Sequence, residues 1–214
     1  MFKKKPFFIV FEGVEGCGKS YQSKKLYNNL KKKKISSILT REPGGTRSAE
    51  MIRSLILKDY FNKNNKEKFD KYTDTLLYLA ARNEHVKNKI IPALKQKKVV
   101  ICDRFVDSTL AYQVYGKKVS LNFINNIHKI ILNGLKPNIT FLLKVSPTTS
   151  KLRLSKRKIK NRYDKFDQSF YNKVQKSFLK IAKNKMNYYV FDSSKNDKVL
   201  ENKIINIVLK HLIK

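Results

Sequence analysis

The chain has 214 residues, of which 48 are Lys or Arg and 16 are Asp or Glu, so its formal net charge is +32. This length predicts a single domain over residues 1–214, large enough to bury roughly 70% of the surface that the unfolded chain exposes. The two cysteines lack the spacing of a zinc site. Since no apolar run reaches the length of a membrane-spanning helix, about 18 residues, we expect a soluble protein in the reducing cytoplasm.

The positive charge, taken alone, favours a polyanionic partner such as nucleic acid. The lysines are instead spread over nearly every predicted helix, and they accompany many asparagines and isoleucines. This distribution is typical of the amino-acid drift of an adenine- and thymine-rich genome. We therefore expect salt-sensitive adhesion to RNA or DNA as a side effect, and no specific nucleic-acid or membrane partner.

Strand and helix patterns alternate along the chain, which predicts an α/β fold with a five-stranded parallel sheet flanked by helices on both faces. The predicted strands are Pro6–Glu12, Ile35–Thr40, Val99–Cys102, Ile139–Val145 and Tyr188–Phe191. The predicted helices are Lys19–Lys33, Thr73–Gln96 with a kink or break at Pro92, Ser120–Asn133 and Asn196–Lys214. Loops are predicted at Arg41–Thr46, Lys58–Tyr72 and Arg153–Asp167, the first and last at the ligand end of the sheet.

The first predicted strand leads directly into a phosphate-binding pattern, GxxxxGK[ST]. Its residues are Gly13, Val14, Glu15, Gly16, Cys17, Gly18, Lys19 and Ser20. Glycines let backbone N–H groups turn toward phosphate oxygens, Lys19 places a charge on the β- and γ-phosphates, and the Ser20 hydroxyl can ligate Mg²⁺. A chance glycine-rich turn is the alternative, but the order of strand, loop and helix favours a P-loop NTPase fold that binds ATP with Mg²⁺.

A second chemical signal lies at the carboxyl end of the strand Val99–Cys102, where Asp103 and Arg104 follow. In a P-loop protein such an acid serves Mg²⁺ and its waters, whereas a loop cap is the simpler structural role. Arg104 favours the metal role, because a guanidinium there can hold a second phosphate bidentately. The three histidines have no acidic or nucleophilic partner at a suggestive spacing, and we expect them to be structural or exposed.

Five strings of residues, in this order, resemble the bacterial thymidylate kinases, and together they run through most of the chain. They are Phe11–Gly16, Arg41–Thr46 with Glu50 and Arg53 after it, Leu77–Arg82, Asp103–Gln113 and Pro137–Leu143. The resemblance implies transfer of the γ-phosphoryl group of ATP to dTMP, which gives ADP and the dTDP needed for dTTP synthesis. It also implies a homodimer.

The resemblance further implies a role for each matching residue. Lys19, Ser20 and the loop amides would hold ATP and Mg²⁺, with Asp103 as a second metal ligand, and Arg104 and Arg53 would hold the monophosphate. Tyr78 would stack on thymine and Arg82 would hydrogen-bond the base, while Ser108, Thr109 and Gln113 would line the pocket. Glu15 would lie near the deoxyribose 3′-hydroxyl, and Tyr112 would disfavour a ribose 2′-hydroxyl. The structural alternative for Tyr78 and Tyr112 is ordinary packing in an aromatic core, and for Arg53 and Arg82 it is a position on a solvated helix face.

The predicted lid, at about 153–167, departs from the family pattern. The family's Asp-Arg-x-Glu corresponds to Asn161-Arg162-Tyr163-Asp164, which loses the first acid and shortens the second. We expect Arg157 or Arg162, and not the surrounding lysines, to act catalytically on the transferring phosphoryl group, because a planar guanidinium contacts two oxygens at once. The alternative is a solvated, lysine-rich helix end.

Two other functions stay open at this point. One is a different nucleotide or deoxynucleoside kinase of the same fold, which the base pocket around Tyr78 and Arg82 would distinguish. The other is a basic protein whose binding to nucleic acid is regulated by ATP, which would require an affinity that survives physiological salt.

Overall fold

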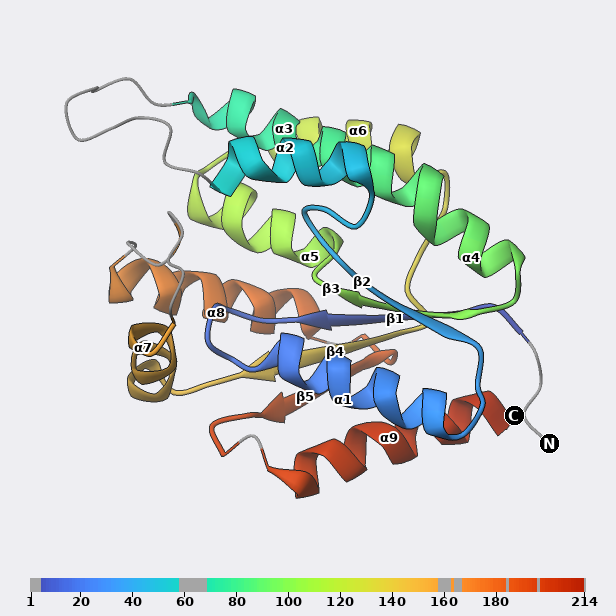
Figure 1. Cartoon of the computed structure of the whole chain (residues 1–214). Helices are drawn as coiled ribbons and strands as arrows, with labels where there is room; N and C mark the ends of the chain where they lie inside the picture. Colours follow the sequence, from blue (N-terminus) through green and yellow to red (C-terminus); the bar gives the residue numbers. More distant parts are fainter. Residues whose placement is uncertain are drawn as a thin grey trace.

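The computed structural model describes residues 5–57, 69–157, 163, 167–183, 185–195 and 197–213. In this part of the chain five parallel strands form a sheet in the order β2-β3-β1-β4-β5 (Figure 1). The strands are β1 Phe7–Glu12, β2 Ser37–Arg41, β3 Val99–Asp103, β4 Ile139–Lys144 and β5 Tyr188–Asp192. The predicted α/β class is therefore confirmed, and no strand boundary differs from its predicted position by more than two residues.

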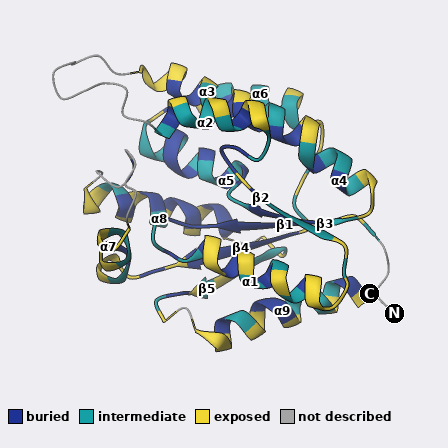
Figure 2. Ribbon diagram, viewed as in Figure 1, coloured by how far each residue is buried: buried dark blue, intermediate teal, exposed yellow. Residues whose placement is uncertain are grey.

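The central strand β1 is buried along its whole length. Its alternate side chains serve two cores, because successive residues of a strand point to opposite faces. Phe7, Ile9 and Phe11 pack into a core shared with α1 (Lys19–Lys32) and α9 (Lys198–Ile213), whereas Phe8 and Val10 pack against the helical turns that precede β3. Figure 2 shows buried residues on the inner sides of the helices and exposed residues on their outer sides. The uninterrupted apolar run of β1 is thus explained by helices on both faces.

The long helical pattern predicted over Thr73–Gln96 is confirmed as one run of three helical elements. These are α3 (Lys71–His85), the π-helix η1 (Val86–Ile90) and α4 (Ile91–Lys95). Pro92 does not end the helix, because it lies in the first turn of α4 just after the wider π turns, where its missing N–H costs little.

The other helices are α2 (Arg47–Leu57), α5 (Val106–Thr109), the π-helix η2 (Leu110–Gly116), α6 (Leu121–Leu132), α7 (Pro147–Ser155) and α8 (Gln168–Ala182). The predictions of α1, α6 and α9 are confirmed, but the prediction of a loop from Arg153 was wrong at its start, because Arg153 lies in α7. Both α7 and α8 were missed, although each begins at a side-chain cap: Ser146 accepts from Thr149 N and Asp167 accepts from Phe170 N. Most of the predicted loops at 58–72 and 153–167 lie outside the described residues.

The edge of the sheet where β1 and β3 end carries the candidate site. The register pairs Phe11 with Asp103, so the segments that follow the two strands begin side by side. Between β1 and β2 the chain crosses over β3, and ligands of such sheets bind at this kind of switch point. Among the helices of the described chain, none has both the length and the apolarity to cross a membrane.

Candidate active site

The loop Gly13–Ser20 forms a tight turn between β1 and α1. Gly13 has φ 139°, and a side chain there would start 2.3 Å from the carbonyl oxygen of Leu143. Glycine is therefore required at this position. Lys19 begins α1, and its Nζ reaches back across the loop to donate to the carbonyl oxygen of Val14 at 2.9 Å. The loop thus presents backbone N–H groups and one cation at the N-terminus of a helix, an arrangement suited to phosphate.

Ser20 and Asp103 meet at the base of the cavity. The Ser20 hydroxyl donates to the Asp103 carboxylate, and both residues line the cavity. The two side chains reach this point from α1 and from the end of β3, so the β1–β3 register brings them together. A hydroxyl and a carboxylate are hard oxygen donors that fit Mg²⁺, which binds few protein ligands and keeps waters and substrate phosphates as the rest.

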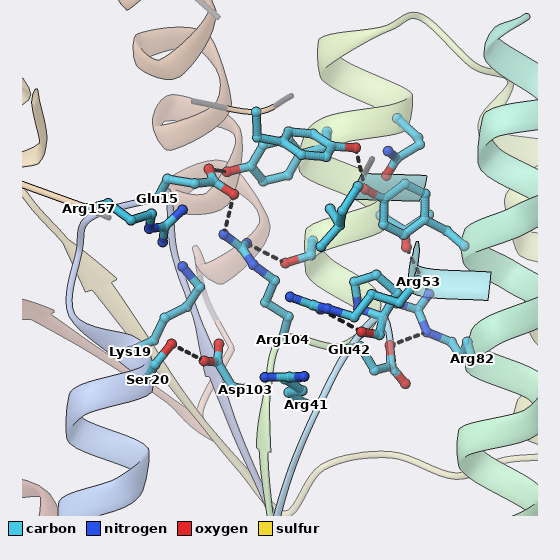
Figure 3. A pocket seen from close by; sticks show the side chains of 18 residues that line it. Glu15, Lys19, Ser20, Arg41, Glu42, Arg53, Arg82, Asp103, Arg104 and Arg157 are labelled. Atoms are coloured by element: carbon cyan, nitrogen blue, oxygen red, sulfur yellow. Dashed lines mark hydrogen bonds and ion pairs between the residues drawn. The ribbon is translucent and has the colours of Figure 1, made fainter. Parts of the chain in front are cut away.

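Arg104 lies at the centre of the cavity, and its guanidinium joins three segments (Figure 3). Its Nη2 donates to Glu15 Oε1 at 2.7 Å, and its Nη1 donates to Ser108 Oγ and to the Gly13 carbonyl oxygen, both at 3.0 Å. Tyr112 donates to the other oxygen of Glu15. Burial opposes ionisation of Glu15, but the charges of Arg104 and Lys19 outweigh it and hold the pKa of Glu15 below its usual value.

A second, deeper arginine is held by a buried polar network. Arg82 donates from Nε to Glu42 at 2.7 Å, from Nη1 to Thr109 Oγ1 at 2.8 Å and to His128 Nε2 at 2.7 Å, and from Nη2 to the Phe105 carbonyl at 2.8 Å. These contacts occupy four of the five N–H groups of the guanidinium, and the remaining one is on Nη2. Arg82 is 3% exposed and still lines the cavity, so it is fixed in place before any ligand arrives.

Glu42 connects this network to β2 and α3. Its Oε1 accepts from His85 Nδ1 at 3.1 Å, while His85 Nε2 accepts from the Thr40 hydroxyl at 2.6 Å. Burial opposes ionisation of Glu42, and the Arg82 charge and the His85 hydrogen bond outweigh burial and lower the pKa of Glu42. Burial and the Arg82 charge lower the pKa of His128 to about 3. Both histidines are structural, as expected, and the acidic partner of His85 is Glu42, which lies 43 positions away and so gave no signal in the sequence spacing.

The remaining predicted residues close the other end of the same cavity, whose volume is about 310 Å³. Tyr78 and Tyr163 contact each other through their hydroxyls, and Tyr163 also lies edge-on to Tyr112. Arg53 donates from Nη1 to the Pro43 carbonyl at 2.6 Å. The side-chain nitrogen of Gln113 is buried and, within the described chain, has no hydrogen-bond partner, so it is a donor available to a ligand.

The cavity collects most of the residues that the sequence singled out, although Gly13, Val14, Gly16, Cys17 and Gly18 of the phosphate loop do not line it. Lining it are Glu15, Lys19, Ser20, Arg53, Tyr78, Arg82, Asp103, Arg104, Ser108, Thr109, Tyr112, Gln113 and Arg157, whereas Arg162 lies outside the described residues. Sequence reasoning missed the parts played by Glu42 and Tyr163. Glu42 stood inside a recognised string, but nothing in its spacing indicated that it pairs with Arg82, forty positions away.

Comparisons with known proteins bear on this geometry. A family model described as thymidylate kinase matches residues 11–204. Thymidylate kinase of Wolbachia pipientis wMel is 43% identical over 205 residues, 93% of this chain and 98% of that protein. The enzyme of aster yellows witches'-broom phytoplasma (strain AYWB) is 43% identical over 209 residues, 96% of each chain. A crystal structure of thymidylate kinase from Ehrlichia chaffeensis matches with a TM-score of 0.72 and 30% identity, over 95% of this chain and 99% of that one.

The Arg82–Glu42 pair generates a stability prediction. Glu42→Gln leaves the buried guanidinium without its counter-charge and should lower the free energy of unfolding by about 3 kcal/mol at pH 7, measured by urea denaturation. The pKa of Glu42 is lowered from 4.5, so this stabilisation is present above pH about 4.5 and is lost as the pH falls through the folded-state pKa. Wild type and variant should therefore converge in acid.

Lys144→Ala is the control for this prediction, because it breaks the exposed Lys144–Asp192 pair, in which Nζ and Oδ2 are 3.8 Å apart. This substitution should lower the free energy of unfolding by no more than about 1 kcal/mol. Equal losses in the two variants at pH 7 would contradict a special role for the buried pair.

Proposed function

The chain belongs to the thymidylate kinase family, and we propose that its central cavity binds ATP and dTMP together and transfers the γ-phosphoryl group from one to the other. One observation carries this proposal: residues of the phosphate loop, Lys19 and Ser20, line the same cavity as Tyr78 and Arg82 at its far end. A donor phosphate at one end and a nucleotide base at the other would bring the acceptor phosphate to Arg104, between them.

The reaction needs little covalent chemistry from the protein. An oxygen of the dTMP phosphate attacks the γ-phosphorus, the bond from that phosphorus to the β–γ bridging oxygen breaks, and the products are dTDP and ADP. Lys19 and the loop amides would hold the donor, while Arg104 and Arg53 would hold the acceptor in line. Since both guanidiniums are already anchored, to Glu15 and to the Pro43 carbonyl respectively, little ordering would remain on binding.

We propose that Ser20 and Asp103 hold the Mg²⁺ that accompanies ATP. The bound ion supplies neutralisation of the charge on the β- and γ-phosphates. The Ser20 hydroxyl donates to Asp103, which keeps both oxygen donors at the base of the cavity.

The far end of the cavity suits thymine. Tyr78 would stack on the ring, and the free N–H of Arg82 and the side-chain amide of Gln113 would face its polar edge. Both groups can donate, and thymine presents carbonyl oxygens where cytosine presents an amino group. Glu15, held by Arg104 and Tyr112, would accept from the 3′-hydroxyl of deoxyribose, and Thr109 and Ser108 complete the wall.

This pocket predicts strong discrimination between bases. The kcat/KM for dTMP should exceed that for dCMP by about 10⁴-fold, because the cytosine amino group opposes the donors of Arg82 and Gln113. The measurement is a side-by-side turnover assay. As the matched control, dUMP keeps both carbonyls and lacks only the methyl group. Its kcat/KM should be lower than that of dTMP by no more than about 10- to 200-fold. Comparable efficiency with dTMP and dCMP would point to another nucleotide kinase of this fold.

We also propose that a lid arginine neutralises charge on the transferring phosphoryl group. Arg157 follows α7 and lines the cavity. Arg153, in α7, donates to the carbonyl oxygens of Gly16, Ser193 and Ser194. Arg157→Ala should lower kcat at saturating substrates by at least about a hundredfold with little change in dTMP binding, as expected for a contact made in the transition state. The neighbouring Lys156→Ala is the control. If kcat falls only a few-fold in both variants, the segment around Arg157 acts as diffuse positive charge.

A homodimer is a further part of the proposal. Helices α2, α3 and α6 lie side by side (Figure 1), and they carry exposed large apolar residues. These are Met51, Leu55, Leu76, Leu121 and Ile130, of which Met51 is 67% and Ile130 is 78% exposed. Exposed large apolar residues on neighbouring helices are typical of an interface between subunits.

The dimer is tested by sedimentation velocity at micromolar concentration. The wild type should sediment as a dimer, and Met51→Asp should raise the dimer dissociation constant by at least about tenfold, because a charge is buried without a partner. Met186→Asp is the control, since Met186 is 98% exposed on the connection between α8 and β5. A monomeric wild type, or equal effects of the two substitutions, would exclude this face.

We place the enzyme in the cytoplasm without a specific nucleic-acid partner. Its two cysteines are unpaired and buried, as suits a reducing compartment. The alternative of an ATP-regulated nucleic-acid-binding protein is disfavoured, because the lysines are spread along the sequence over nearly every helix.

A further inference from the structure

Glu12, the last residue of β1, is a buried acid that has no part in the proposed mechanism. It is 1% exposed and does not line the substrate cavity. Its Oε1 accepts from the backbone N–H groups of Phe105 and Ser108, at 2.8 and 3.2 Å, and its Oε2 accepts from the Ser108 hydroxyl at 2.6 Å. One carboxylate thus holds both ends of the segment from residue 105 to residue 108, directly behind Arg104.

Arg104 needs such support because its backbone is strained. It has φ 73°, in the left-handed region that residues with a side chain rarely occupy. The backbone N–H of Arg104 donates to the Phe11 carbonyl oxygen at 2.9 Å, and the next N–H, of Phe105, donates to Glu12. Consecutive residues of β1 therefore hold the turn that aims Arg104 into the cavity.

A second connection runs through the Ser108 side chain. The Ser108 hydroxyl gives its only hydrogen to Glu12, which leaves its lone pairs for Arg104 Nη1, at 3.0 Å. Without an ionised acceptor at Glu12 the hydroxyl is free to rotate, and the guanidinium loses one of the contacts that set its angle. Glu12 therefore acts on both the backbone and the side chain of Arg104.

We propose that Glu12 is a positioning residue for binding of the acceptor phosphate: through the 105–108 turn and the Ser108 hydroxyl it holds Arg104 in the orientation that contacts dTMP. This inference rests on the proposed function, in which Arg104 binds the phosphate of dTMP. It adds a residue that touches neither substrate but governs one that does.

The ionisation state of Glu12 bears on this role. Burial and the neighbouring Asp107 raise its pKa from 4.5 to about 7, against the hydrogen bond from Ser108 and the charge of Arg104. Cys102 of β3 and Tyr188 of β5 also face it electrostatically. As the pH falls through about 7 the carboxyl takes up a proton, and one oxygen changes from an acceptor into a donor. The contact with the Ser108 hydroxyl then reverses.

The test is a double-mutant cycle on KM for dTMP and for ATP, with kcat recorded for each variant. Glu12→Gln keeps the shape and mimics the protonated acid, and it should raise KM for dTMP about tenfold and KM for ATP less than about twofold. In the Arg104→Ala background the same substitution should change KM for dTMP less than about twofold, because its target is gone. Circular dichroism and thermal melting check the fold of each variant.

A pH series from 6 to 8 separates positioning from mere loss of packing. The wild-type KM for dTMP should rise toward low pH relative to that of Glu12→Gln, since only the wild type has a titrating group at this position. The ratio of the two variants cancels titration of the dTMP phosphate itself. Asp74→Asn is the matched control: this acid is also buried, in α3, and accepts from Lys117 instead of holding the Arg104 turn. It should leave KM for dTMP at pH 8 within about twofold.

The outcomes separate the two proposals. If Arg104→Ala leaves KM for dTMP unchanged, the proposed role of Arg104 fails. If Arg104→Ala weakens dTMP but Glu12→Gln has no effect, or the same effect in both backgrounds, the positioning proposal is overturned. Should Glu12→Gln fail to fold, Ser108→Ala removes the side-chain connection alone, and an unchanged KM for dTMP in that variant also overturns the proposal.

Discussion

The parallel pairing of β1 with β3 is the constraint on which the site depends. Phe11 lies opposite Asp103, so the phosphate loop and the Asp103–Arg104 turn leave the sheet at the same edge and contact each other directly. The Phe11 carbonyl accepts from Arg104 N, and the Gly13 carbonyl accepts from its guanidinium. A shift of one residue in this register would turn every β1 side chain to the opposite face, so packing of both cores enforces the catalytic geometry.

Scarce negative charge is concentrated where it acts. The chain has 16 acidic residues against 48 basic ones, yet Glu15 and Glu42 line the substrate cavity, Glu12 lies behind it, and each holds an arginine or its turn. Buried carboxylates keep the guanidiniums oriented without cancelling the positive field that two anionic nucleotides require. The surface lysines contribute to that field only diffusely, because salt screens exposed charges.

Much of the fold and the site could be predicted from sequence because the signals are local. The strands are short apolar runs, and the phosphate loop is a contiguous pattern. Helix α6 begins at a serine cap and ends before Asn133 and Gly134, and Asn133 has the left-handed conformation. Helix α7 was missed because it is short and carries only two leucines, and its one signal is the cap at Ser146. Helix α8 was missed although Tyr171, Val174, Phe178 and Ile181 recur at helical spacing after the cap at Asp167. The lid arginine Arg162 stays a prediction, since it lies outside the described residues.

The sequence by itself determined the class of fold and the phosphate-binding loop, since both follow from neighbouring residues, and its resemblance to a known family indicated which further side chains line the cavity. Only the tertiary structure decided how those side chains are held. Arg82 donates to four residues that are at least 23 positions away in sequence, and Glu12 accepts from residues more than ninety positions away. Such contacts depend on burial and on the juxtaposition of distant strands. No local pattern predicts them, because a buried polar group bonds the groups that lie next to it in the folded chain.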